Sequence, residues 1–183
     1  MLVETLHKNW LLLSEKYFKN TFEAVILWDK IKKNYSSKNR YYHNLMHIYT
    51  MLQKASENKS QIKNYNEVLF AIWFHDIIYI PTSKKNEEKS ADFAKFALKN
   101  ISKENIEIDV IYQLIMSTKS HQIILKENTD NAFLLDFDLA ILGADWKFYQ
   151  AYIQNIRKEY KMYPNFLYNP ARKKVLLNFS VFL

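Results

Sequence analysis

A neighbouring histidine and aspartate, His75 and Asp76, lie inside an apolar segment of the chain. Residues 68–80 read V-L-F-A-I-W-F-H-D-I-I-Y-I, and the pair supplies the only strongly polar side chains of this stretch. Burial of an ionised carboxylate is costly unless another group compensates its charge, and a metal ion is the most effective compensator. The pair therefore predicts a metal site, and a core histidine hydrogen-bonded to a neighbour is the alternative.

Two further segments carry residue types that bind metals. Upstream, His43 and His47 have a spacing that puts them about 40° apart on one face of a predicted helix. Downstream, residues 133–142 are apolar except for Asp136 and Asp138, which is typical of a buried helix. Packing alone hardly explains three buried segments with such residues, so together they favour a functional site.

The elements that must position these residues are predicted to be helices. One glycine and three prolines among 183 residues leave little material for hairpin turns. Apolar residues recur at helical spacing, which predicts an all-α bundle of about nine helices. The 49% hydrophobic content supports one core, so we expect residues 1–183 to form a single helical domain. The apolar end, residues 175–183, either docks in this core or indicates that a longer protein has been truncated.

The helix boundaries follow from apolar spacing, caps and breakers. The His75 and Asp76 pair falls inside a predicted helix that Pro81 terminates. Asn86 resembles an N-cap, and capping alone explains Glu87 and Glu88 as well as a role in the site does. The predicted ranges are 2–18, 21–34, 43–57, 65–79, 107–118, 133–142 and 146–162, with one more helix starting near residue 86.

Composition narrows the class of protein. The chain has no cysteine, so imidazole and carboxylate groups must hold any metal. No stretch approaches the roughly 20 apolar residues of a membrane span, and no signal-peptide pattern opens the chain, so we expect a cytoplasmic protein with no membrane partner. The net charge of +7 comes from scattered lysines, which favours solvated helix faces over a nucleic acid partner. Whether the chain forms a homo-oligomer is left open by the sequence.

The order of the chemical residues resembles that of HD-domain metal-dependent phosphohydrolases. A histidine, a His-Asp pair and a later aspartate match the H…HD…D pattern of that superfamily. Over roughly residues 40–175, five blocks resemble a bacterial branch of predicted HD phosphohydrolases of unassigned substrate. The blocks are YHxxxHI from Tyr42, FHDIIY from Phe74, NEExSA from Asn86, DxDLAILG from Asp136 and RxEY from Arg157. The chain departs from these relatives at its C-terminus, where they continue for about another helix.

The resemblance implies one divalent metal ion and a set of ligands. It favours Asp138 over Asp136, which lies about 200° away on the same helix. It favours His47 over His43, because an apolar helix continues from His47 as it does after the ligand histidine of relatives, and His43 then faces the substrate. The implied ligands are His47, His75, Asp76 and Asp138.

Such a ligand set leaves positions for water and for a phosphate oxygen, so the expected reaction is hydrolysis of a phosphate ester or anhydride in a nucleotide or similar small molecule. Nitrogen and oxygen ligands do not distinguish among Mn, Fe, Mg, Co, Ni and Zn. The candidate proton acceptors are Asp136, Glu87 and Glu88. The candidate substrate-binding residues are His43, Lys119, His121 and Arg157, with Lys84 as a further cation.

Two other functions stay open at this stage. Some HD-fold proteins carry two irons and oxidise their substrates, and His43, Glu87 or Asp136 would be the ligands of a second metal here. Alternatively, the domain binds nucleotide or nucleic acid through its positive charge without turnover.

Overall fold

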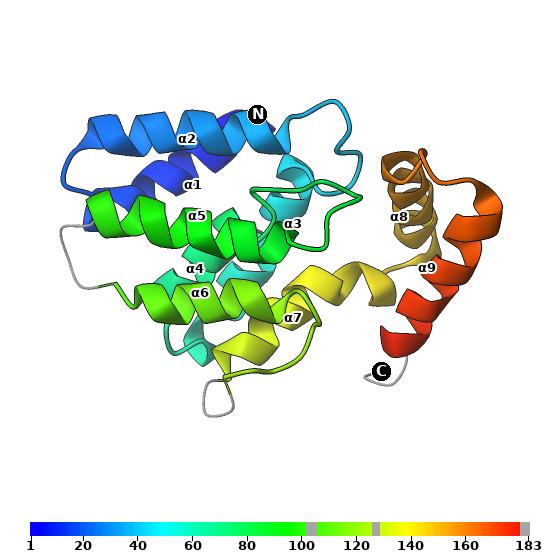
Figure 1. The fold of residues 1–183 in the computed structure, drawn as a ribbon. Coiled ribbons are helices and arrows are strands. Elements are labelled where there is room, and N and C mark those ends of the chain that lie inside the picture. Colours follow the sequence, from blue (N-terminus) through cyan, green and yellow to red (C-terminus); the bar gives the residue numbers. More distant parts are fainter. Residues whose placement is uncertain (102–105, 126–128, 180–183) are drawn as a thin grey trace.

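A computed structural model describes residues 1–101, 106–125 and 129–179, and these residues contain no β-strand (Figure 1). The predicted all-α fold is confirmed for this part of the chain. None of the described helices combines the length and the apolar character that a membrane crossing requires. The α-helices are α1 (Leu2–Tyr17), α2 (Thr21–Tyr35), α3 (Leu45–Glu57), α4 (Tyr65–Phe74), α5 (Asn86–Ile101), α6 (Ile108–Ser117), α7 (Asp130–Leu139), α8 (Trp146–Glu159) and α9 (Asn165–Phe179), with 3₁₀ helices η1 (Lys59–Gln61) and η2 (Ala140–Gly143).

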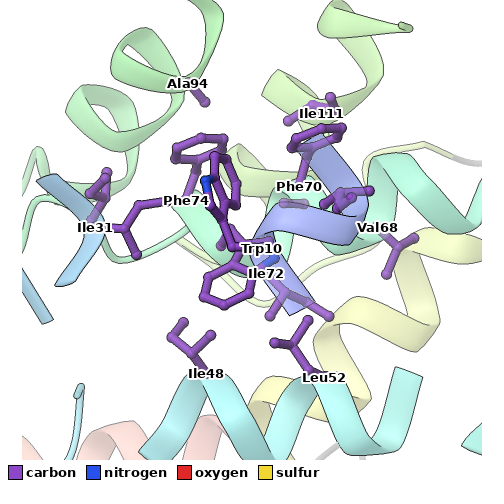
Figure 2. Packing of buried hydrophobic residues seen from close by; sticks show 14 of the residues in the cluster. Trp10, Ile31, Ile48, Leu52, Val68, Phe70, Ile72, Phe74, Ala94 and Ile111 are labelled. Atoms are coloured by element: carbon purple, nitrogen blue, oxygen red, sulfur yellow. The ribbon is translucent and has the colours of Figure 1, made fainter. Parts of the chain in front are cut away.

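Helix α4 is the centre of the bundle because its side chains are apolar nearly all round. It packs against α3, α5, α6 and α7. Trp10 of α1 meets the edges of the Phe70 and Phe74 rings of α4, with centroids 6.1 and 5.9 Å apart. In Figure 2, Ile48 of α3 lies on one side of these rings and Ala94 of α5 on the other. Each large buried apolar side chain contributes about 1.5–3 kcal/mol, so this core holds α3, α4 and α7 in place.

The turn that carries His75 and Asp76 is not helical, so the predicted helix over 65–79 is wrong at its C-terminal end. Helix α4 stops at Phe74. The His75 amide still donates to the Ala71 carbonyl at 2.8 Å, but the carbonyls that follow bond to a side chain: the Arg40 guanidinium donates to the carbonyls of Asp76 at 2.6 Å and Ile77 at 3.0 Å. A buried cation from a distant loop thus terminates this helix well before Pro81.

The histidine helix also begins later than predicted. Asn44 is the N-cap of α3, and its side-chain oxygen accepts a hydrogen bond from the Met46 amide at 2.9 Å. His47 lies in the first turn of α3, whereas His43 precedes the helix. The expectation that both histidines share one helical face is therefore wrong, because the Asn44 cap separates them.

Helices α8 and α9 pack against each other at one end of the molecule (Figure 1). Helix α9 contains no fully buried residue, and its Val175 and Leu177 are exposed. The described portion of the apolar end therefore does not dock in the core, and residues 180–183 lie outside the described residues.

A buried carboxylate, Asp130, connects the start of α7 to the start of α4. It accepts hydrogen bonds from the amides of Lys63 at 2.8 Å and Asn64 at 2.7 Å and is fully buried. Asp130→Ala leaves both donors without this acceptor, so we expect the free energy of unfolding in urea to fall by about 2–3 kcal/mol. The exposed Asp109, paired with Lys95, is the control, and Asp109→Ala should cost less than about 1 kcal/mol. Equal losses in the two variants would contradict this role of Asp130.

Candidate metal centre

Four side chains converge where α3, α4 and α7 meet. The Nε2 atoms of His47 and His75 lie 3.3 Å apart. Asp138 Oδ1 lies 3.1 Å from Nε2 of His47, and Asp76 Oδ2 lies 3.3 Å from Nε2 of His75. Metal bonds of about 2.0–2.2 Å bring neighbouring ligand atoms to about 3.0–3.5 Å from one another. Both the distances and the donor types of His47, His75 and Asp76 thus fit a divalent ion, and Asp138 adjoins this group through His47 and, at 3.9 Å, His75.

Local structure aims each ligand atom at this point. His47 comes from the first turn of α3, Asp138 from the last turn of α7, and the other two residues from the turn after α4. The Nδ1 atom of His75 bonds to the Ile72 carbonyl at 3.0 Å, which leaves Nε2 directed at the cluster. Metal-binding histidines use their second nitrogen in this manner.

The pKa shifts of the cluster residues favour charged side chains in spite of burial. Burial alone would lower the pKa of His75, but the carboxylates of Asp76 and Asp138 and the Ile72 carbonyl together outweigh burial and raise this pKa to about 9. Burial would likewise raise the pKa of Asp138, but hydrogen bonds from His121 and His47 hold it well below the usual range. In this state a histidinium compensates the buried carboxylates, which is the role that a bound cation would take over.

The two aspartates of α7 lie on different sides of the helix. The Asp138 carboxylate is only 13% exposed and lies in the cluster, whereas Asp136 is exposed and does not line the adjoining cavity. The geometry agrees with the choice of Asp138 as the ligand. It does not support Asp136 as a catalytic group, because a spacing of two residues turns its side chain away from the centre.

A cavity of about 300 Å³ adjoins the cluster and brings several of the sequence-predicted residues to it. Glu87 and His121 line this cavity. The pKa of Glu87 is raised by partial burial, which makes its carboxylate a better proton acceptor than an exposed glutamate. The Nε2 atom of His121 lies 3.1 Å from the second oxygen of Asp138, so this histidine also orients a predicted ligand.

Three other predicted residues lie outside the cavity lining. Glu88 and Lys119 form an ion pair with each other on the surface. The Arg157 guanidinium donates to the carbonyls of Tyr160 and Tyr163 at 2.9 and 3.0 Å, and it therefore closes the turn between α8 and α9. The expected roles of Glu88 in proton transfer and of Lys119 and Arg157 in phosphate binding are not supported, because these groups are engaged elsewhere.

His43 lines the cavity beside the cluster, and Glu159, the glutamate of the RxEY block to which the sequence analysis assigned no role, holds it there. Glu159, 2% exposed at the end of α8, accepts bonds from Nδ1 of His43 at 2.6 Å and from the Tyr79 hydroxyl at 2.9 Å. It also accepts the backbone amides of Tyr42 and His43 at 2.7 and 3.1 Å. Burial alone would lower the pKa of His43, but the bond to Glu159 raises it. With Nδ1 engaged, Nε2 is the nitrogen that His43 offers to a ligand.

Arg40 is a second residue that the sequence did not single out. Arg40 is buried, and its guanidinium lies over two aromatic rings. The Cζ atom is 4.8 Å from the centroid of the Tyr35 ring and 5.4 Å from that of the Tyr79 ring. It donates to the His43 carbonyl at 3.2 Å in addition to the two carbonyls after α4. Arg40 therefore fixes the His-Asp turn relative to the segment before α3. A charged residue in a polar loop gave no sequence signal for this role.

No family model, curated protein or solved structure matches the chain. The fold and the geometry show an all-α protein in which a buried group of His47, His75 and Asp76, with the partly buried Asp138 beside it, adjoins a cavity.

Proposed function

We propose that the protein is an HD-type metal-dependent phosphohydrolase that cleaves a phosphate ester or anhydride in a nucleotide or similar small molecule. The observation that carries the proposal is the convergence of His47, His75, Asp76 and Asp138 from three separate segments onto one point beside a cavity. Buried carboxylates are otherwise expensive, and a cation between them offsets this cost.

The ligand types suit one divalent ion from the series Mn, Fe, Co, Ni and Zn, and Mg is a further candidate. Such an ion, when bound, lowers the pKa of a coordinated water and polarises a phosphoryl oxygen. Side chains around the cavity provide proton transfer and substrate binding. The Glu87 carboxylate accepts a proton from the attacking water, and His43, held by Glu159, binds the substrate through Nε2.

The protein purified without chelator or affinity-tag metal tests the proposal. We expect about one divalent ion per chain, measured by elemental analysis, and release of inorganic phosphate from members of a panel of phosphorylated metabolites. Chelation should abolish the release, and one or more of the six metals should restore it. Absence of stoichiometric metal, together with absence of phosphate release under every metal, would contradict the proposal.

Among the described residues, no specific contact favours the two alternatives over hydrolysis. Asp136 is exposed away from the centre, which removes one expected ligand of a second iron. The same preparation tests both alternatives: oxygen consumption by the iron-loaded protein would favour an oxygenase, and salt-sensitive RNA binding would favour a nucleic-acid-binding domain.

A further inference from the structure

A single arginine shares the lining of the cavity with residues of the histidine and aspartate cluster. Among the described residues that line this cavity, Arg172 of α9 is the only lysine or arginine. The cations considered from the sequence, Lys119, Lys84 and Arg157, do not line it. An anionic ligand in this cavity therefore finds one permanent positive side chain, and α9 supplies it.

The Arg172 guanidinium is held in place but retains free donors. One Nη2 hydrogen bond goes to the Tyr152 hydroxyl, and Cζ lies 5.2 Å from the centroid of the same ring. No ion pair joins Arg172 to a carboxylate in the part of the chain that the structure describes. A guanidinium has five N–H donors, so most of them stay available. The Arg157 guanidinium, in contrast, donates its hydrogen bonds to Asn165 and to two backbone carbonyls.

The charges around the cavity favour a ligand with one phosphoryl group. The carboxylates of Asp76, Glu87 and Asp138 share the lining with Arg172. The bound ion of the proposed function already offsets the charges of Asp76 and Asp138, so every additional phosphoryl group would add negative charge for which the described lining offers no further lysine or arginine. A diphosphate or triphosphate is thus disfavoured relative to a monoester.

The size and surface of the cavity indicate what the phosphoryl group is attached to. A volume of about 300 Å³ lies at the lower end of the range for small-molecule pockets. Much of its wall is aromatic, and ring faces and edges pack well against a planar or cyclic group. The tyrosines of the lining are Tyr42, Tyr79, Tyr152, Tyr160 and Tyr168.

We propose that Arg172 binds the phosphoryl oxygens of the substrate and that the substrate is a phosphomonoester of a compact, ring-bearing molecule. The inference rests on the proposed function, since it takes the cluster of histidines and aspartates as the metal site. A bidentate guanidinium is well suited to the task because two of its N–H groups match two phosphoryl oxygens.

The test is a calorimetric titration of inorganic phosphate into the metal-loaded protein. We expect Arg172→Gln to raise the dissociation constant for phosphate by about tenfold or more, and Arg172→Lys to raise it by a smaller factor, because lysine keeps the charge but loses the paired geometry. Lys174→Gln is the matched control: it removes one charge from an exposed position of α9 outside the cavity lining and should leave the constant unchanged. Metal content should be the same in all variants.

Equal phosphate affinity in Arg172→Gln and Lys174→Gln, with metal retained, would overturn the role of Arg172. If Arg172→Gln does not fold, Arg172→Lys decides, and phosphate affinity equal to that of the wild type would overturn it. Tighter binding of pyrophosphate or triphosphate than of phosphate by the wild type would overturn the monoester assignment. Absence of metal from the wild type would instead refute the proposed function, and titration of the chelator-treated protein then reports on Arg172 alone.

Discussion

His75→Ala and Asp76→Ala are each expected to abolish metal binding and, with it, hydrolysis of phosphorylated substrates. The two side chains contribute neighbouring ligand atoms, 3.3 Å apart, from a turn that Arg40 fixes through two carbonyl bonds. Truncation of either one removes one of the three ligand atoms that lie close enough together to hold an ion. Metal content should fall from about one ion per chain to below about 0.1.

The control for this experiment is Asp92→Ala, which removes a carboxylate from an exposed position of α5. It should retain both the metal and the activity. Circular dichroism of each variant confirms that the helices persist, so that loss of metal is not loss of fold. Equal metal content in the wild type, His75→Ala and Asp76→Ala would rule out the site.

Asp138→Ala is expected to lose the metal, whereas Asp136→Ala is expected to retain both metal and turnover. The two residues form a matched pair on α7: both substitutions delete a carboxylate from the same helix. Asp138 lies 3.1 Å from both His47 and His121, while Asp136 is exposed. Residues that hydrogen-bond to a metal ligand without contacting the metal already contribute about 10–100-fold to metal affinity. Loss of the ligand itself should therefore lower the metal affinity by at least about 100-fold.

Metal titration and phosphate-release kinetics on the two variants decide this assignment. Loss of metal in Asp136→Ala with full retention in Asp138→Ala would reverse it. Retained metal in Asp136→Ala with strongly impaired turnover would instead return Asp136 to the catalytic role that the sequence had proposed for it.

The convergence of His47, His75, Asp76 and Asp138 could be predicted because each lies in or beside an apolar segment. Apolar segments must pack together, and their few polar residues are then forced into proximity. The exact ends of α3 and α4 could not be predicted in the same way. They depend on the Asn44 cap and, above all, on Arg40, which lies 36 residues before Asp76 in the chain.

The roles of residues around the cluster were harder to predict from the sequence, because they too depend on long-range packing. Glu159 ends a run of three charged residues in α8, and Arg172 begins another in α9. In a single sequence, such a charge is most simply explained by a solvated helix face. Only the packing of these helices against the bundle reveals that Glu159 is buried and that Arg172 lines the cavity.

The order of the elements along the chain has a consequence for biosynthesis. All four cluster residues precede α8, whereas Glu159 and Arg172 come later. A nascent chain leaving the ribosome therefore carries all four cluster residues before it carries the helices that complete the cavity lining. The cluster can therefore assemble before the cavity is complete, and Glu159 then joins the late helices to the earlier segments through His43 and Tyr79.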